Sequence, residues 1–223
     1  MSGYFGSKAA SGLCQAIIAM MPPHETYIET HLGGGAIMKR KPPTVNNIGI
    51  DIDPEPLSSF DCAYPVHLVN DCAHHYLTHY DYSGAELIYC DPPYLTETRT
   101  SPRKYRFEYT KQDHIALLEL LKGLTCHIIL SGYPSSLYDD LLCDWHTITL
   151  QAMTRGGPRT EKLWFNYDID RTFWASYAGK NFTDRQRIKR KSQRWRNKYE
   201  ALPNAERLAV LAAIMEVEGT ETL

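Results

Sequence analysis

Residues 86–94 read Glu86-Leu87-Ile88-Tyr89-Cys90-Asp91-Pro92-Pro93-Tyr94. The residues up to Cys90 make a short apolar run, which is typical of a strand that is buried on both faces. Two prolines follow, and because proline fixes its own backbone angle and cannot extend a sheet, the strand ends at Asp91. The Asp91 carboxylate and the Pro92 carbonyl should therefore point rigidly away from the strand end, with the Tyr94 ring beside them. A purely structural turn is the alternative.

Similar short apolar runs recur on both sides of this stretch, and helical patterns alternate with them. The strands that we expect cover residues 27–32, 47–52, 66–69, 86–90, 127–130, 146–150 and 162–167. The helices that we expect cover residues 7–20, 112–122, 137–142, 183–199 and 204–217, with a further helix-like stretch after residue 69. This alternation indicates an α/β fold with a mainly parallel sheet covered on both faces. The last two strands would place an antiparallel element at one edge.

Chemically distinctive residues follow three of these strands. In open α/β sheets, ligands bind beyond the carboxyl ends of the strands. The first strand leads through Glu29 into the triplet Gly33-Gly34-Gly35, and glycines let a backbone approach a ligand closely. The second ends at Asp51, where an acidic side chain commonly accepts hydrogen bonds from the ribose of an adenosine cofactor. Taken singly, the triplet could be a tight turn and Asp51 a helix cap.

The third strand end, at Asp91, is suited to a specific reaction. The exocyclic amine of adenine is a poor nucleophile because its lone pair is delocalised into the ring. Two acceptors that hold its two hydrogens, Asp91 and Pro92, would favour a tetrahedral nitrogen whose lone pair faces an electrophile. Such catalysis depends on positioning and fixed dipoles. The Tyr94 ring would offer a stacking surface for a base rotated out of its helix.

The Asp91–Tyr94 motif, together with Glu29 and the glycine triplet upstream, resembles the DNA adenine methylase family, which uses S-adenosylmethionine (SAM) to methylate DNA amines. Further segments are similar to the short, phage-type members of that family. These segments are residues 4–8, 107–109 with the following helix, 130–133 and 159–167. The resemblance covers most of the chain, and the Asp-Pro-Pro-Tyr motif is its most specific part.

The resemblance implies a Rossmann-like SAM-dependent methyltransferase fold with a seven-stranded sheet, and transfer of a methyl group to the N6 amine of a flipped adenine in DNA. An aspartate in the first position suggests adenine, since the cytosine enzymes usually carry serine there. The residues implied for binding the cofactor are Tyr4, Gly6, Lys8, Glu29, Gly33, Gly34, Gly35, Asp51 and Asp71. The residues implied for catalysis are Asp91, Pro92, Pro93 and Tyr94.

The chain departs from the family pattern in two places. Members usually carry Pro-Phe after the glutamate of the glycine motif, whereas this chain has Thr30-His31. Larger members also carry a target-recognition insertion between the third and fourth strands. Only about 20 residues separate Asp71 from Asp91, so such an insertion does not fit there. Recognition of a DNA sequence must therefore come from another part of the chain, or it must be weak.

The charge of the chain is strongly segregated. Net charge is −2, yet residues 180–200 hold nine basic residues against two acidic ones. Lysine and arginine bind phosphates without reading sequence, although a solvated helix face is the alternative. The residues that we expect to contact nucleic acid are Arg99, Arg103, Lys104, Arg106, Arg155, Arg159, Lys189, Arg190 and Arg194. We accordingly predict a catalytic domain over residues 1–170 and a helical, DNA-contacting extension over residues 171–223 that packs on it.

Other sequence features are unremarkable for a globular enzyme. The 223 residues include six cysteines without a Cys-x-x-Cys pair, no long apolar stretch and no recognisable signal peptide. We therefore expect a cytoplasmic protein with reduced cysteines and without membrane segments. His74, His75 and His79 have spacings that metal sites use, but without an obvious partner ligand we expect no metal.

Four alternatives remain open at this stage. Two keep the chemistry and change the target, to adenine in RNA or to the N4 amine of cytosine. A third is a nicotinamide-dependent oxidoreductase, although the contiguous glycines do not follow the Gly-x-Gly-x-x-Gly spacing. The fourth is a non-catalytic DNA-binding module that keeps a relict pocket. The recognition sequence, the oligomeric state and the biological role are also open.

Overall fold

The computed structural model describes residues 13–99, 106–154, 157–168, 178–179 and 182–219. The chain divides into two compact units, residues 1–180 and residues 181–223.

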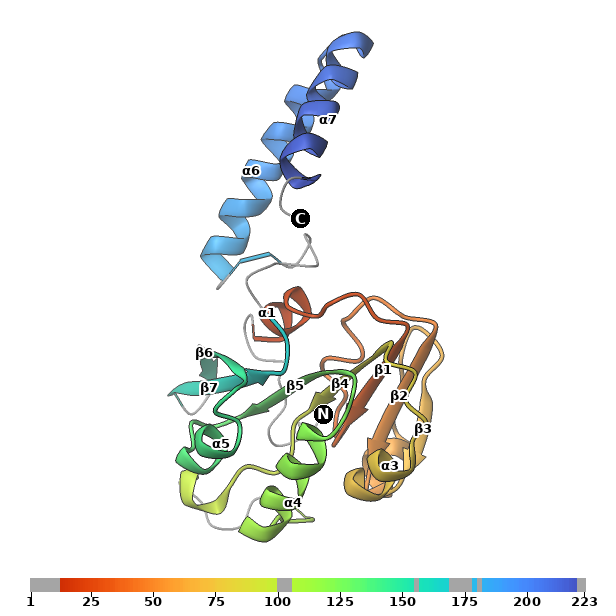
Figure 1. Ribbon diagram of the computed structural model, residues 1–223, viewed down its shortest axis with the longest axis vertical. Coiled ribbons are helices and arrows are strands. Elements are labelled where there is room, and N and C mark those ends of the chain that lie inside the picture. Colours follow the sequence, from red (N-terminus) through yellow and green to blue (C-terminus); the bar gives the residue numbers. More distant parts are fainter. Residues whose placement is uncertain (1–12, 100–105, 155–156, 169–177, 180–181, 220–223) are drawn as a thin grey trace. The chain divides into compact units, whose positions relative to one another are not determined.

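The first unit is built on a seven-stranded sheet (Figure 1). Its strands are β1 (Thr26–Thr30), β2 (Asn46–Asp51), β3 (His67–Asn70), β4 (Glu86–Cys90), β5 (His127–Gly132), β6 (His146–Thr154) and β7 (Gly157–Phe165). They lie in the order β3-β2-β1-β4-β5-β7-β6. The pairs from β3 to β5 are all parallel, whereas β7 runs antiparallel to both of its neighbours. The strand order reverses between β1 and β4, so this is the switch point of the sheet.

Helices cover both faces of this sheet (Figure 1). The helices are α1 (Leu13–Ala19), α2 (Pro54–Ser58), α3 (Ala73–His79), α4 (Lys111–Lys122) and α5 (Ser136–Leu141), with a short 3₁₀ turn η1 (Thr96–Thr98). On one face, α3, α4 and α5 pack their leucines against Ile28, Ile88 and Ile128. On the other, α1 and the segment after β1 pack against Tyr27, Leu87 and Tyr89. Successive strand residues point to opposite faces, so each strand contributes to both cores.

Local sequence explains where these elements begin. The α4 helix starts with a capping box, in which the Thr110 side chain accepts from the Asp113 amide and the Asp113 carboxylate accepts from the Thr110 amide. At α2 the Asp53 side chain accepts from the Glu55 amide, and Pro54 occupies the first helical position. The β4 strand is buried at every position, as its unbroken apolar run predicts.

The reversed strand β7 is tied to the helix layer by side-chain hydrogen bonds. Lys162 Nζ donates to Asp139 Oδ1 at 2.6 Å, and Trp164 Nε1 donates to the same oxygen at 3.0 Å. Phe165, the next residue along the strand, packs in the opposite core. The alternation of Lys162, Trp164 and Phe165 therefore fixes the register of β7 in the sheet.

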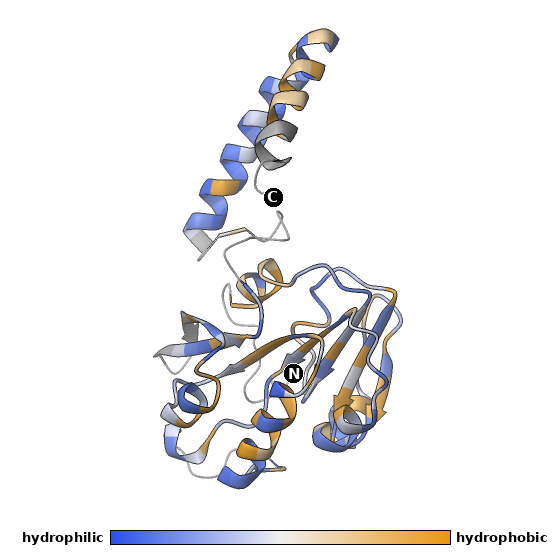
Figure 2. Ribbon diagram, viewed as in Figure 1, coloured by the Kyte–Doolittle hydropathy of each residue, from blue (hydrophilic) through white to orange (hydrophobic). Residues whose placement is uncertain are grey.

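The second unit contains two helices, α6 (Phe182–Glu200) and α7 (Asn204–Gly219). The turn between them is held by Arg207, whose guanidinium donates to the carbonyls of Leu202 and Glu200 at 2.8 Å each. Figure 2 shows hydrophilic residues along most of α6 and hydrophobic ones along much of α7. Within the described residues, no helix has the length and apolar character needed to cross a membrane.

The fold class predicted from the sequence is confirmed. The sheet has seven strands, is mainly parallel and is covered on both faces, with an antiparallel pair at one edge. The reversed strand itself is the second from that edge, because β7 inserts between β5 and β6. The β6 strand continues to Thr154, past its predicted end at residue 150. The β7 strand begins at Gly157 rather than at residue 162 and ends at Phe165 rather than at residue 167. The added residues do not continue the apolar pattern that marks the predicted strands.

Candidate active site

A cavity opens at the switch point, between the ends of β1 and β4. It spans about 970 Å³ of space, a figure that includes open solvent. Every described residue that the sequence suggested for cofactor binding or catalysis lines it. These residues are Glu29, Gly33, Gly34, Gly35, Asp51, Asp71, Asp91, Pro92, Pro93 and Tyr94. Tyr4, Gly6 and Lys8 lie outside the described residues.

The glycine loop after β1 is held against the end of β2. Gly33 N–H donates to Asp51 Oδ2 at 2.7 Å, and Asp53 N–H donates to Asp51 Oδ1 at 2.9 Å. Gly33 and Gly35 have φ values of 47° and 59°, in the left-handed region that favours glycine. A Cβ on Gly35 would lie 2.3 Å from the Phe60 ring, so that position also lacks room for a side chain. The loop is therefore a compact turn, and the Asp51 carboxylate at the end of β2 holds it through the Gly33 amide.

Glu29 is a buried acid in the floor of the cavity. It is 3% exposed, and its Oε2 accepts from the Tyr27 hydroxyl at 3.0 Å. Burial raises the pKa of Glu29 to about 8, although the Tyr27 hydrogen bond opposes this rise. A ligand that brings a positive charge to this carboxyl would stabilise its ionised form and lower its pKa.

Two further acids belong to the wall beyond β2 and β3. Asp53 Oδ1 accepts from Arg106 Nη1 at 3.0 Å, and the same nitrogen lies 3.0 Å from Glu55 Oε2. Asp71 accepts from His75 Nδ1 at 2.7 Å, and this hydrogen bond lowers the pKa of Asp71. Arg106, one of the residues predicted to contact nucleic acid, is thus anchored over the cavity while 61% of its side chain stays exposed.

Asp91 has a partner on the neighbouring strand β5. Its Oδ1 lies 2.9 Å from Ser131 Oγ, and because a carboxylate can only accept, Ser131 donates. The Tyr89 hydroxyl lies 3.0 Å from the same Ser131 oxygen. This short chain holds one oxygen of Asp91 in place at the cavity wall.

Tyr94 is held from both its ends. The hydroxyl donates to Glu161 Oε1 at 2.7 Å, and the ring packs against Tyr133 with centroids 4.3 Å apart. Burial raises the pKa of Tyr94 well above its ordinary value, which keeps the phenol protonated as a donor. Only 7% of Tyr94 is exposed, so its ring is a fixed part of the cavity wall.

The residues predicted to contact nucleic acid differ in their surroundings. Arg99 is 2% exposed and pairs with both oxygens of Glu108, at 3.0 and 2.7 Å, so it closes the base of its own loop. On α6, Lys189, Arg190 and Arg194 are exposed. Arg103, Lys104 and Arg155 lie outside the described residues, as does the side chain of Arg159.

Several site residues were not singled out from the sequence. Ser131 and Glu161 contact Asp91 and Tyr94, and the His31 ring lies at the cavity with Tyr109. Ser131, Glu161 and Tyr109 all belong to segments that resemble the methylase family, so those segments were the signal that could have found them.

The charges around the cavity distinguish between classes of ligand. Among the described residues that line it, five are carboxylic acids and Arg106 is the one permanent cation. Such a lining disfavours a pyrophosphate group and favours a ligand that carries positive charge. Within the described residues, no group of three or more potential ligands could hold a metal ion.

Comparisons with known proteins found matches among solved structures. No model of a known family matches the chain, and no curated protein sequence matches it. Precorrin-6y C5,15-methyltransferase from Geobacter metallireducens matches with a TM-score of 0.49 and 9% identity over 74% of this chain and 91% of its own. The N-methyltransferase NodS from Bradyrhizobium japonicum matches with a TM-score of 0.48 and 8% identity over 69% of this chain and 93% of its own.

A third structure, the O-methyltransferase TomG from Streptomyces achromogenes in complex with SAM, has a TM-score of 0.44 and 13% identity, and the match covers 69% of this chain and 77% of TomG. The fold assignment rests on the strand order and pairing of this chain.

Proposed function

We propose that this chain is a SAM-dependent methyltransferase that modifies the N6 amine of adenine in DNA, with the target base flipped into the cavity. The observation that carries the proposal is that the glycine loop with Asp51 and the Asp91–Tyr94 motif line one cavity, on the two sides of the switch point.

The residues present fit this cofactor by their chemistry. When bound, SAM supplies an activated methyl group on a positively charged sulfonium. The glycine loop, Glu29, Asp51 and Asp71 would hold it. The buried carboxyl of Glu29 suits a cationic partner, and the excess of acids argues against the two phosphates of a nicotinamide dinucleotide.

Asp91 and Pro92 would bind the target amine on the other side of the cavity. Ser131 holds one oxygen of Asp91, and each carboxylate oxygen has two lone pairs, so the carboxylate can still accept from an amine. The Pro92 carbonyl would accept the second hydrogen. Two fixed acceptors favour a nitrogen with its lone pair directed at the methyl donor, and they need little reorganisation during transfer.

Tyr94 would stack on the flipped base. Its hydrogen bond to Glu161 and its contact with Tyr133 fix the ring, so little side-chain entropy is lost on binding. Stacking on an aromatic ring tolerates any base. Selection of adenine then depends on the acceptors at Asp91 and Pro92.

The basic helix α6 would bind the DNA backbone. Its exposed cations include Lys189, Arg190 and Arg194, and phosphate contacts of this kind give affinity without sequence information. The connection between β3 and β4 consists of α3 and a short segment, which leaves no room for a recognition insertion. We therefore propose only limited sequence reading by this chain.

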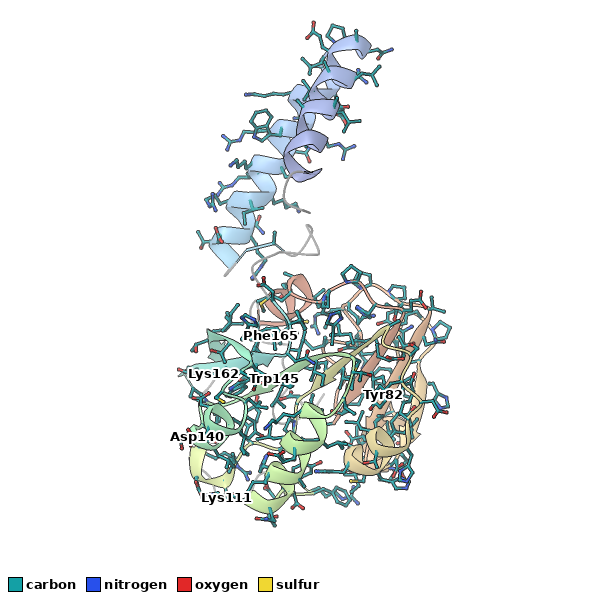
Figure 3. The ribbon with its side chains drawn as sticks, in the orientation of Figure 1. Tyr82, Lys111, Asp140, Trp145, Lys162 and Phe165 are labelled. Atoms are coloured by element: carbon teal, nitrogen blue, oxygen red, sulfur yellow. The ribbon has the colours of Figure 1, made fainter. Side chains whose placement is uncertain are left out.

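The proposal is tested by incubating the protein with SAM and mixed-sequence duplex DNA or RNA, digesting the products to nucleosides and weighing them. N6-methyldeoxyadenosine is the expected product. Asp91→Ala should keep SAM binding within about twofold and lose at least about a hundredfold in transfer, as for the loss of a fixed catalytic acceptor. Asp140→Ala, an exposed substitution on α5 (Figure 3), is the matched control and should leave both unchanged.

Each other outcome contradicts part of the proposal. Methylated adenine in RNA alone would change the substrate, and N4-methylcytosine would change the base. Calorimetric binding of NAD without binding of SAM would favour an oxidoreductase. SAM binding without any methylated product would favour a DNA-binding module. Full turnover by Asp91→Ala would remove the proposed catalytic role of Asp91.

A further inference from the structure

A hydrogen-bonded chain of side chains runs beside the cavity and ties its outer wall to the sheet. His31 Nε2 lies 2.8 Å from the Tyr109 hydroxyl, which lies 3.3 Å from His74 Nδ1. At one end, His31 Nδ1 lies 3.0 Å from Thr30 Oγ1. At the other, His74 Nε2 lies 3.0 Å from the Asp113 carbonyl oxygen. The chain thus joins the end of β1 to α3 and α4.

The partners of this chain constrain where its protons lie. A carbonyl oxygen only accepts, so His74 Nε2 donates to Asp113. The Tyr109 hydroxyl lies between two ring nitrogens, so it can donate to one of them while its oxygen accepts from the other. Burial lowers the pKa of His31 to about 3, which keeps its ring neutral with a single N–H. Hydrogen bonds that run in one direction strengthen one another.

Tyr109 ends a short segment, residues 106–109, that forms one wall of the cavity. Arg106 at its start bonds to the buried Asp53 and the exposed Glu55, while 61% of its own side chain stays in water, which weakens both ion pairs. Glu108 pairs with the buried side chain of Arg99, which follows the turn η1. Tyr109 links the other end of the segment to the sheet, through its hydroxyl and through a ring that packs against His31.

Phe107 lies between these attachments. It is 39% exposed and lines the cavity together with Arg106 and Tyr109. Its position depends on the backbone that Tyr109 holds. The backbone of His31 is itself unusual, because its φ of 55° lies in the left-handed region, which a non-glycine residue seldom adopts. His31 thereby points its ring at Tyr109 rather than along the strand.

We propose that His31 and Tyr109 are positioning residues, whose hydrogen bond holds the 106–109 segment as the outer wall of the cofactor pocket. This inference rests on the proposed function as far as the cofactor is concerned. Neither residue is assigned to the transfer step. The pair should therefore affect how tightly SAM is held and leave the rate at saturating SAM unchanged.

Three variants and one control test the inference. Tyr109→Phe removes the hydroxyl and keeps the ring. His31→Asn keeps a residue that tolerates the left-handed backbone but shortens the side chain beyond reach of Tyr109. The double variant tests whether the two changes act on one interaction. Tyr82→Phe, at a side chain labelled in Figure 3, is the matched control. The Tyr82 hydroxyl donates to the Leu77 carbonyl, and Tyr82 is not among the residues that line the cavity.

Two measurements are made on each protein: the dissociation constant for SAM by calorimetry, with KM and kcat alongside, and amide hydrogen exchange of residues 106–110 without ligand. Each single variant should raise the dissociation constant and KM for SAM roughly tenfold, with kcat within about twofold, as for one lost buried hydrogen bond. The double variant should be no worse than the singles. Exchange should quicken roughly tenfold in the variants and stay unchanged in Tyr82→Phe.

The results that overturn the inference are distinct from those that overturn the proposed function. Wild-type exchange and affinity in Tyr109→Phe would show that the hydroxyl does not hold the segment. Strictly additive effects of the two substitutions would show that they act separately. A wild-type protein that binds no SAM would refute the proposed function and the cofactor role of the pair, whereas the exchange measurement would still decide whether the pair anchors the segment.

Discussion

Glu29 offers the sharpest test of the cavity's electrostatics, through the substitution Glu29→Gln. The glutamine keeps the shape of the side chain and an oxygen that accepts from the Tyr27 hydroxyl, but it cannot ionise. Burial raises the pKa of Glu29 from an ordinary 4.5 to about 8 in the folded protein. The substitution therefore changes how both folding and ligand binding depend on pH.

The effect on folding follows from proton linkage. Below about pH 4.5 the carboxyl is protonated in the folded and unfolded chain alike, and it does not affect stability. Between about pH 4.5 and 8 the unfolded chain has released a proton that the folded chain keeps, so stability falls by about 1.4 kcal/mol per pH unit. At pH 7 this amounts to about 3 kcal/mol, and Glu29→Gln should recover up to that amount.

The effect on binding has the opposite sense. A cationic ligand favours the ionised carboxyl, so wild-type protein should release up to about one proton when it binds SAM at pH 7. Its affinity for SAM should rise by up to about tenfold per pH unit as the pH approaches 8. Glu29→Gln should lack this release and bind SAM more weakly at pH 8.5. Protons that SAM itself exchanges cancel when the two proteins are compared.

Two assays measure these effects. Urea unfolding of ligand-free protein from pH 5 to 8.5 gives the difference in unfolding free energy between wild type and Glu29→Gln. Calorimetry at pH 7, in two buffers with different ionisation enthalpies, gives the protons released with SAM. Equal proton release by the two proteins, or a stability difference that does not change with pH, would refute the inference that burial keeps Glu29 protonated and that a cationic ligand ionises it.

Three further predictions concern the loop, the catalytic acid and the basic helix. Gly35→Ala should lower the free energy of unfolding, measured in urea, by about 2–4 kcal/mol, because the added Cβ would meet Phe60. Gly84 also has a positive φ, of 90°, but it has open space around it, so Gly84→Ala should cost only about 1–2 kcal/mol. Ser131→Ala should slow transfer about tenfold and leave the calorimetric affinity for SAM unchanged, because it removes the donor that holds Asp91; an unchanged rate would contradict this positioning role. Replacing the three predicted DNA-contacting cations of α6 with alanine should reduce the slope of log binding constant against log salt by about 3, and an unchanged slope would mean that α6 does not contact phosphates.

Much of the architecture could be predicted because it depends on local sequence. The strands β2, β3 and β4 each end at or just before an aspartate, and β4 matches its predicted bounds at both ends. The site residues at strand ends were predictable for the same reason. A parallel sheet brings the carboxyl ends of its strands to one edge, so residues after β1, β2 and β4 had to lie near one another.

Contacts between distant segments could not be predicted in this way. Ser131 reaches Asp91 across 40 residues because β5 pairs with β4. Glu161 reaches Tyr94 across 67 residues because β7 lies next to β5 in the sheet. That adjacency depends on the insertion of β7 ahead of β6, which no local pattern marks. Arg99 shows the same limit, since the sign of its charge fits a phosphate as well as it fits Glu108.

The segregation of charge bears on how a nucleic acid could reach this cavity. The described lining holds five acids against the single cation Arg106, whereas α6 carries an excess of basic residues. A phosphate would be repelled from the cavity and attracted to α6, while an adenine base is neutral and would be admitted. Under the proposed function, the energy that extrudes a base from the helix must then come from phosphate contacts outside the cavity. An isolated adenosine should accordingly be a poor substrate even at saturating SAM, because it gains nothing from those contacts.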